Sequence, residues 1–327
     1  MNLMSSRSVD QGAPEATRSA GRIRVLLIGA SGFVGSRILR ALQTRTDALV
    51  TILSRRPNDA PRAHGTAVVP GDLMTPSSLS SAINGIDVVI NAASYVGGDR
   101  EQAMRVNLDG TLAILRACES SPVSRIIQLS TTAVYGSGPH KGVHPWEVAS
   151  NPESVASRSR AMAEHAVLAA GGIIVRPNLI YGWGDRWFIP GTVRMIKALG
   201  ATIDHGRALI SIIDVEDLGI LAAALATTPR QVSGAFHAAQ PIPISLRRLL
   251  ANISDHIADL ETKQSTSLED AVSKLEVSGF RPHQVHMLGA DHHYLSSELW
   301  TLAGHAPETF RISPEAISWY RKTPGLY

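Results

Sequence analysis

The stretch Val25-Leu-Leu-Ile28-Gly29-Ala-Ser-Gly32-Phe-Val-Gly35 decides the fold of this chain of 327 residues. Val25–Ile28 is a short apolar run, the glycines follow it directly, and Ser36–Thr44 has helical periodicity. This order predicts a strand, a tight loop and a helix. Backbone N–H groups and the helix N-terminus at such a loop present partial positive charge to a pyrophosphate, so the stretch indicates a dinucleotide site.

Strand-like and helical stretches alternate along the first half of the chain. The pattern predicts an α/β fold, a Rossmann-type doubly wound parallel sheet. After the first strand and helix, the predicted strands are Leu49–Leu53, Thr66–Val69, Val88–Asn91, Ile126–Ser130 and Ile173–Arg176. The predicted helices between them lie at Ser78–Ile83, Glu101–Cys118 and Arg158–Ala169.

The alternation stops after Arg176, where the Gly- and Trp-rich loop Tyr181–Phe188 begins a different pattern, with one short strand near Ala235–Ala238. We therefore expect a disordered tail over residues 1–21 and an NADP-binding Rossmann domain over 22–180. Residues 181–327 are expected to form mainly a smaller C-terminal substrate-binding lobe and lid, with some sheet elements returning to the Rossmann domain.

Composition excludes several classes of protein. The 31 Lys and Arg and 28 Asp and Glu residues are scattered, so we expect no nucleic-acid partner. The single cysteine, Cys118, permits neither an intramolecular disulfide nor a thiolate metal site and suits a cytoplasmic protein. No apolar run reaches the roughly 18 residues that span a bilayer, so no membrane partner is expected. A monomer and a homodimer both remain open.

Histidines near the C-terminal end suggest a metal cluster at first sight. They are His283, His286 and the run Asp291-His292-His293. This stretch contains Gly and Pro and has no second strong metal motif, so we interpret it as a mobile lid over a ligand and predict no metal.

The end of the second predicted strand bears on cofactor choice. An NAD enzyme usually places an acid here for the ribose 2′-hydroxyl, but the sequence reads Ser54-Arg55-Arg56. A serine hydroxyl and two guanidinium groups suit a 2′-phosphate, which favours NADPH over NADH. The alternative interpretation is a solvated basic turn.

Several separate motifs from Ile23 to about Tyr320 resemble those of the extended short-chain dehydrogenase/reductases. Besides the GASGFVG loop they are Gly71-Asp72-Leu73, Asn91-Ala92-Ala93, the run Val106–Thr111, the run Ser130–Gly136, Arg176-Pro177, Tyr181-Gly182 and the run Asp214–Leu218. The resemblance implies that the cofactor contacts Gly29, Ser31, Gly32, Phe33, Val34, Ser54, Arg55, Arg56, Asp72, Leu73, Ala92, Ala93, Ser94, Asn107, Pro177 and Asn178. It places Asp72 and Leu73 at the adenine, Ala92 to Ser94 near the ribose, and Pro177 and Asn178 near the nicotinamide.

The family's catalytic Tyr-x-x-x-Lys pair is missing. The pattern Ser159-Arg160-Ala161-Met162-Ala163-Glu164 fixes the register and puts Ala156 at the tyrosine position and Arg160 at the lysine position. No shifted alignment restores the pair, because no tyrosine lies between residues 135 and 181 and the only lysine there is Lys141. Arginine stays protonated at any working pH, so Arg160 could bond a neighbouring group but could not relay a proton.

Thr131 matches the position of the family's serine and keeps one hydroxyl. It could polarise a carbonyl as a weak catalytic group, or it could simply end the strand. A substrate ketone hydrogen-bonded to its own phenol would carry a built-in donor, as in aromatic polyketides with a peri hydroxyl group. The resemblance to an atypical family member without the tyrosine implies an angucyclinone ketone as the substrate. The sequence therefore predicts an NADPH-dependent ketoreductase with substrate-assisted proton supply.

Two other functions remain open: a nucleotide-sugar reductase or epimerase, which would want the missing tyrosine, and a non-catalytic regulator that senses NADP. Against the regulator stands an aromatic surface suited to a flat polycyclic ligand, although most aromatic side chains in any domain are core. The predicted substrate-binding residues are Tyr95, Trp183, Trp187, Phe188, Phe280 and Met287, with Tyr294 nearby.

Overall fold

A computed structural model describes residues 21–61, 65–260 and 264–323. All of the predicted N-terminal tail except Gly21 lies outside the described residues. A seven-stranded sheet forms the centre, in the order β12-β7-β5-β4-β1-β2-β3, and every strand pair in it is parallel. The predicted doubly wound fold is confirmed. The strands are β1 (Ile23–Ile28), β2 (Ala48–Ser54), β3 (Thr66–Pro70), β4 (Val88–Asn91), β5 (Arg125–Leu129), β7 (Ile173–Pro177) and β12 (Gly234–Ala238).

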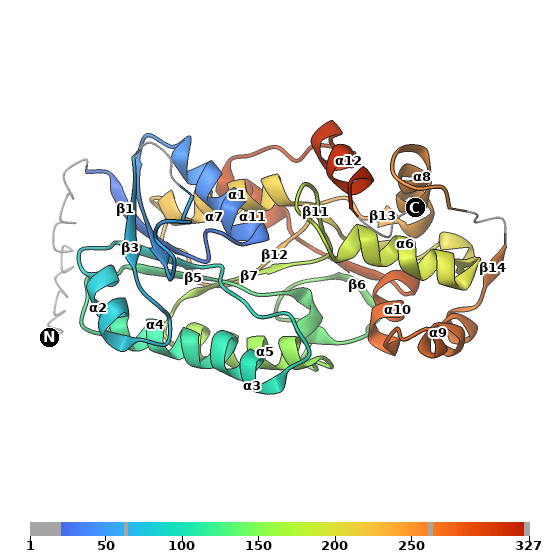
Figure 1. The fold of residues 1–327 in the computed structure, drawn as a ribbon, viewed down its shortest axis with the longest axis horizontal. Helices are drawn as coiled ribbons and strands as arrows, with labels where there is room; N and C mark the ends of the chain where they lie inside the picture. Colours follow the sequence, from blue (N-terminus) through green and yellow to red (C-terminus); the bar gives the residue numbers. More distant parts are fainter. Residues whose placement is uncertain (1–20, 62–64, 261–263, 324–327) are drawn as a thin grey trace, which may run out of the picture.

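Helices cover both faces of this sheet (Figure 1). Val25 and Leu27 of β1 pack on one face, with α1 (Phe33–Gln43), α7 (Val215–Thr227) and α11 (Ser297–Ala303). Leu26 and Ile28 pack on the other face, with α2 (Pro76–Ile83) and α4 (Gly110–Cys118). Successive side chains point to opposite faces of a strand, so a strand buried on both sides needs a continuous apolar run. The apolar sequence before the glycine loop meets this need. Helix α5 (Val155–Ala169) packs on β7.

The predicted helix over residues 101–118 contains a change of winding. It consists of α3 (Arg100–Ala103), a π-helical stretch at Met104–Asp109 and α4. Such stretches are rare and often occur at functional sites. The buried Asn107 lies within this one.

The second lobe has its own core and its own small sheets. Four strands pair in the order β13-β10-β15-β6, and two further pairs join β8 to β11 and β9 to β14. These strands are β6 (His140–Val143), β8 (Ile180–Tyr181), β9 (Thr202–Ile203), β10 (Leu209–Ile210), β11 (Ile213–Asp214), β13 (Ile244–Ser245), β14 (Ser265–Thr266) and β15 (His292–Tyr294). The helices are α6 (Phe188–Leu199), α8 (Leu246–His256), α9 (Leu268–Val277), α10 (Pro282–Gly289) and α12 (Pro314–Arg321), with 3₁₀ turns at Thr132–Tyr135 and Asp204–Gly206.

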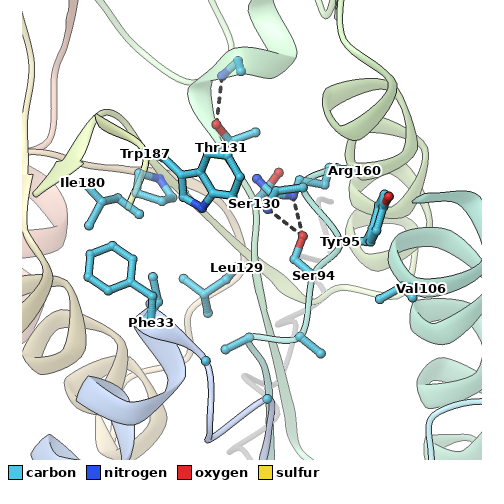
Figure 2. Close-up of a pocket in the computed structure, with 18 of the residues that line it drawn as sticks. Phe33, Ser94, Tyr95, Val106, Leu129, Ser130, Thr131, Arg160, Ile180 and Trp187 are labelled. Carbon is cyan, nitrogen blue, oxygen red and sulfur yellow. Dashed lines mark hydrogen bonds between the residues drawn. The ribbon is translucent and has the colours of Figure 1, made fainter. Parts of the chain in front are cut away.

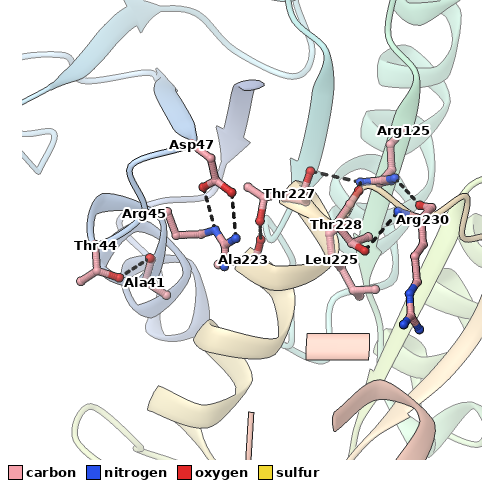
Figure 3. Close-up of polar contacts among 11 residues, drawn as sticks. Ala41, Thr44, Arg45, Asp47, Arg125, Ala223, Leu225, Thr227, Thr228 and Arg230 are labelled. Carbon is pink, nitrogen blue, oxygen red and sulfur yellow. Dashed lines mark hydrogen bonds and ion pairs between the residues drawn. The ribbon is translucent and has the colours of Figure 1, made fainter. Parts of the chain in front are cut away.

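One arginine ties the returning helix α7 to the central sheet (Figure 3). The guanidinium of Arg125, on β5, donates to the carbonyl oxygens of Leu225 at 2.9 Å, Ala226 at 3.1 Å, Thr228 at 3.1 Å and Arg230 at 2.8 Å. The last carbonyl groups of a helix have no partners within the helix, and a cation also suits their partial negative charge. Arg125 therefore caps α7 from the sheet. Within the part of the chain that the structure describes, no helix is both long and apolar enough to cross a membrane.

Candidate functional site

A cavity of about 1330 Å³ lies at the carboxyl ends of β1, β2, β4, β5 and β7, where ligands bind in sheets of this kind. The strand ends and the loops after them form one side. The other side comes from the start of α6 and from α10. Figure 2 shows Phe33 and Trp187 on one side of the pocket and Ser94, Tyr95 and Arg160 on the other.

The glycine loop between β1 and α1 lines the cavity. Gly29 has a φ of +85°, and a Cβ there would lie 2.6 Å from the backbone nitrogen of Ala93. A Cβ on Gly35 would overlap the carbonyl oxygen of Gly29, and one on Gly32 would lie 3.2 Å from the same oxygen. The first turn of α1 has no side-chain cap and no acidic residue. Its free N–H groups and the space that the glycines leave fit a pyrophosphate.

Arg55 and Arg56 border the far end of the cavity, just beyond β2. Both side chains are exposed, and the backbone N–H of Arg56 donates to Ser54 Oγ at 3.2 Å. Asp59 also lines the cavity, an acid that the sequence reasoning did not single out. Asp72 and its neighbour Leu73 line the same region.

The position of the missing catalytic pair is occupied by a different interaction. Ala156 does not line the cavity, whereas Arg160 does, and its Nε and Nη2 atoms donate to Ser94 Oγ at 2.9 and 2.6 Å (Figure 2). Ser94 Oγ in turn donates to Asn107 Oδ1 at 3.1 Å. Burial lowers the pKa of Arg160 to about 10, so the guanidinium remains charged at neutral pH. Arg160 holds Ser94, and because it stays protonated at neutral pH it does not relay a proton.

Asn107, predicted as a cofactor contact, lies behind the cavity wall instead. Its Oδ1 accepts from the backbone N–H of Tyr95 at 2.8 Å, and its Nδ2 donates to the carbonyl oxygen of Tyr95 at 2.9 Å and to Ser159 Oγ at 2.9 Å. A side chain held by these bonds on the buried side of the chain cannot also face the cavity. Asn107 therefore fixes the wall residues Ser94 and Tyr95.

Two hydroxyl groups lie side by side in sequence after β5. Thr131 Oγ1 accepts from the backbone N–H of Ala133 at 3.2 Å, which leaves its proton available to an acceptor in the cavity. Ser130 also lines the cavity, and its buried Oγ has no hydrogen-bond partner among the described residues. Such a hydroxyl is rare and calls for an explanation, and bonding to a ligand would supply one. The sequence reasoning passed over Ser130.

The remaining predicted residues divide into those that line the cavity and those that do not. Trp183 lies outside it, in a separate depression, with the Arg37 guanidinium 4.7 Å from its ring centre. Positive φ angles at Gly182 and Gly184, +121° and +97°, flank it and turn the chain there. The predicted residues that line the cavity are Gly29, Ser31, Gly32, Phe33, Val34, Ser54, Arg55, Arg56, Asp72, Leu73, Ala92, Ala93, Ser94, Tyr95, Thr131, Pro177, Asn178, Trp187, Phe188, Phe280 and Met287.

Tyr294 is also outside the cavity, in a buried cluster with Tyr135, His140 and His237. Tyr135 Oη lies 2.7 Å from His237 Nε2. Burial raises the pKa of Tyr135 to about 12 and lowers the pKa of His140 to about 4 and that of His237 to about 3. These groups are neutral packing groups at neutral pH.

Glu153 and His283 also line the cavity. Glu153 Oε1 accepts from the backbone N–H of Ser137 at 2.8 Å, and this bond is the main reason that the pKa of Glu153 is lowered. Burial lowers the pKa of His283, and the charge of Glu153 opposes that shift. Glu153 was not predicted from the sequence. Over residues 21–61, 65–260 and 264–323, no group of three or more His, Cys, Asp or Glu side chains is placed to hold a metal ion.

Comparison with known proteins identifies the family. Residues 25–237 match the sequence pattern of the NAD dependent epimerase/dehydratase family, and the chain belongs to this family. The predicted relationship to the extended short-chain dehydrogenase/reductases is thereby confirmed.

Individual relatives share about 30% sequence identity or less with this chain, over part of its length. A 2-alkyl-3-oxoalkanoate reductase of Stenotrophomonas maltophilia is 27% identical over 51% of this chain and 54% of its own length. A 4-hydroxy-2-methyl-3-oxo-4-farnesyl-3,4-dihydroquinoline-1-oxide ketoreductase of Stigmatella aurantiaca is 30% identical over 62% of this chain and 64% of its own length. The chain thus spans between half and two thirds of the length of these relatives.

Among solved structures, the UDP-glucuronic acid 4-epimerase of Bacillus cereus, in complex with NAD, superposes with a TM-score of 0.65. The superposition covers 92% of this chain and 97% of the epimerase at 19% identity. This similarity shows a shared fold.

Proposed function

We propose that this protein is an NADPH-dependent ketoreductase that reduces a ketone of an aromatic polyketide, of the angucyclinone class, to an alcohol without a catalytic tyrosine. The observation that carries the proposal is one cavity that joins the glycine loop and the uncapped start of α1 to the Arg160–Ser94 pair, with Arg160 at the position of the family's lysine and no tyrosine at the position of Ala156. The two relatives described above are named a reductase and a ketoreductase, which supports a ketone as the reacting group.

The cofactor side favours NADPH. The reduced nicotinamide supplies a hydride when it is bound. Arg55 and Arg56, both exposed at the cavity edge, would hold the 2′-phosphate, and the uncapped turn of α1 would hold the pyrophosphate. Pro177 and Asn178 border the region where the nicotinamide would lie.

The proton must come from a group other than a protein phenol. A substrate phenol bonded to the ketone oxygen would stabilise the developing alkoxide, so the protein needs mainly to place the ketone. Thr131 could add one hydrogen bond, since its hydroxyl proton is not used by the neighbouring turn. Aromatic and soft side chains line the substrate side and suit a flat ring system, namely Tyr95, Trp187, Phe188, Phe280 and Met287.

Loss of the tyrosine also makes the chain similar to one atypical member of the family, the simocyclinone 7-oxo-ketoreductase of angucyclinone antibiotic biosynthesis. This resemblance suggests the substrate class.

The direct test is to incubate the protein with NADPH and a panel of angucyclinone ketones and dTDP-keto-sugars, and to follow the loss of absorbance of the reduced nicotinamide. We expect turnover of the aromatic ketones alone. Oxidation of NADPH by the sugars would favour the nucleotide-sugar reductase. An epimerase returns the hydride to the sugar and leaves the absorbance unchanged, so interconversion of sugar epimers, followed by chromatography, would favour the epimerase, whose fold this chain shares. Tight NADP binding with turnover of neither class would favour the NADP-sensing regulator.

Replacing Thr131 tests the source of the proton. Thr131→Val should lower the rate of reduction by less than about a hundredfold, below the usual cost of losing an oxyanion donor in an enzyme that depends on it. Methylating the substrate phenol next to the ketone should lower the rate further. Abolished turnover in Thr131→Val, with cofactor and ketone still bound, would contradict substrate assistance, as would equal rates for the methylated and free phenols.

Restoring the family's pair provides a second arm of this test. Ala156→Tyr with Arg160→Lys should give little gain, because the added phenol must fit a space shaped around alanine. Lysine cannot reproduce the two hydrogen bonds that Arg160 makes to Ser94. A large gain in the rate of reduction would contradict substrate assistance, because it would mean that the wild-type protein is limited by the lack of a protein proton donor.

A further inference from the structure

The segment Gly182–Trp187 connects β8 to α6 and touches both parts of the site. At Gly184, a Cβ would lie 3.1 Å from Cδ2 of Phe33, so the segment runs against a residue of the cofactor loop. Its other end leads into Trp187 and Phe188, which line the substrate side of the cavity. The position of this segment therefore sets the position of the aromatic wall.

Asp185 organises the segment from inside. Its side chain is buried, and the residue is only 1% exposed. Oδ1 accepts from the backbone N–H groups of Trp187 at 2.7 Å and Phe188 at 2.8 Å, and Oδ2 accepts from that of Ile189 at 2.9 Å. A carboxylate at a helix N-terminus satisfies the free N–H groups there. The first turn of α6, including both wall residues, is thus bonded to one carboxylate.

The C-terminal helix α12 supplies the remaining partners of this segment. Tyr320 Oη donates to Asp185 Oδ2 at 3.0 Å and accepts from the backbone N–H of Gly182 at 2.8 Å. Trp319 Nε1 donates to the carbonyl oxygen of Asp185 at 2.9 Å. Tyr320 is fully buried, so both of its bonds are shielded from water. Two neighbouring side chains near the end of the chain thereby hold a loop that lies 134 and 135 positions earlier.

The charge on Asp185 makes the tyrosine bond important. Burial raises the pKa of the Asp185 carboxyl above its ordinary value, and the three backbone N–H groups and the Tyr320 hydroxyl oppose that rise. Removing one donor leaves a buried carboxylate short of a partner, which is more costly than losing an exposed hydrogen bond. The segment should then open more readily than the rest of the molecule.

We infer that Tyr320 is a positioning residue for the substrate: through Asp185, the terminal helix holds the aromatic wall formed by Trp187 and Phe188 in the geometry that binds the ketone. The inference rests on the proposed function only in naming a ketone as the ligand of this wall. The hold of α12 on the segment is independent of that assignment.

The first experiment does not need a substrate. Tyr320→Phe keeps the ring and removes only the hydroxyl, and trypsin can report opening of the segment by cleaving after Arg186, whose side chain is exposed. We expect the ratio of cleavage after Arg186 to cleavage after Arg230, an exposed loop site, to rise by about tenfold or more, the effect of losing one hydrogen bond to a charged group. An unchanged ratio would overturn the inference.

Tyr294→Phe is the matched control. Tyr294 is also a buried tyrosine, 3% exposed, but its hydroxyl lies 3.1 Å from His140 Nδ1, and its ring packs in the cluster around Tyr135. Tyr294→Phe should leave the Arg186 to Arg230 ratio at its wild-type value. An equal rise in both variants would mean general loosening and would overturn the role of Tyr320. Should Tyr320→Phe fail to fold, Trp319→Phe removes the neighbouring bond to the carbonyl oxygen of Asp185, and the ratio should rise by about threefold or more, the effect of losing one hydrogen bond between neutral groups.

The second experiment concerns the ketone. With a ketone that the wild-type protein reduces, Tyr320→Phe should raise KM by about tenfold and change kcat by less than about twofold, because the reacting groups themselves are untouched. A fall in kcat at constant KM would contradict a positioning role in binding. If the wild-type protein reduces no ketone, the proposed function fails, and the cleavage ratio alone decides whether α12 positions the wall.

Discussion

The two halves of the cavity are built in different ways. In the half that we propose for the cofactor, the glycine loop and the turn after β3 are held by near neighbours in sequence: the N–H of Gly32 bonds the carbonyl of Gly29, and Asp72 bonds the N–H of Met74. In the substrate half, Asp185 bonds Tyr320, 135 residues away. Hydrogen bonds between near neighbours in sequence form wherever the short sequence motif occurs. A hydrogen bond between residues far apart in sequence forms only when the whole chain is folded. The cofactor half should therefore tolerate changes elsewhere in the chain, and the substrate half should not.

The largest effect should follow from filling the cofactor cradle. Gly32 has an ordinary φ of −77°, so valine can adopt its backbone, but the new side chain occupies the space of the pyrophosphate. We expect Gly32→Val to weaken NADPH binding by more than about a hundredfold, or about 2.7 kcal/mol, as measured by fluorescence titration. Gly304→Ala, at a φ of +60° with no atom near its Cβ, should cost some stability and leave NADPH affinity intact. Retained affinity in a folded Gly32→Val protein would mean that the loop is only a turn.

A smaller effect should come from the charged rim of the same half. We expect NADPH to bind at least about tenfold tighter than NADH, or about 1.4 kcal/mol, and Arg55→Ala with Arg56→Ala to remove this preference. Arg45→Ala is a matched control, because this arginine pairs with Asp47 outside the cavity (Figure 3). Equal affinities for the two cofactors in the wild-type protein would favour the alternative interpretation, in which these arginines belong to a solvated turn and do not contact the cofactor.

The smallest expected effect is on the KM for the ketone, and it should differ between two tryptophans that lie four positions apart. Trp187 lines the cavity, and Trp183 packs against Arg37 outside it. Trp187→Ala should raise KM for the ketone about fivefold, or about 1 kcal/mol, the worth of one aromatic contact. Trp183→Ala should leave KM within about twofold of its wild-type value and lower the melting temperature, because the cation–π contact is lost. Equal rises in KM for the two variants would contradict this distinction and would mean that Trp183 affects ketone binding as strongly as Trp187.

The strands and the glycine loop could be predicted because their signals are local. An apolar run followed by glycines marks the end of a strand, and a Ser-Arg-Arg run marks the end of the next. The seven-stranded parallel sheet and the family membership follow from such patterns.

Other features of the site depend on contacts that no short pattern encodes. The motif around Asn107 was recognisable, but it encodes neither the π-helical stretch in which Asn107 lies nor the bonds that direct its amide to the backbone of Tyr95. The direction of Trp183 depends on the glycines on either side and on Arg37. Glu153 lies in a loop and belongs to no recognisable sequence motif, so the residues next to it in sequence do not indicate that its side chain lines the cavity.

The chain crosses between the two lobes several times: it leaves the sheet after β5 to form β6, returns with α5 and β7, leaves again, returns with α7 and β12, leaves once more, and returns with α11 before α12. This path matters for engineering by recombination. A chimera of two relatives joined at a single crossover near residue 180 would take α7 from one parent and its partner α1 from the other, and would separate Arg125 from the carbonyl groups that it caps. Exchanging the second lobe as a unit therefore requires several splice points, placed on either side of β6, after β7, before α7, after β12, and on either side of α11.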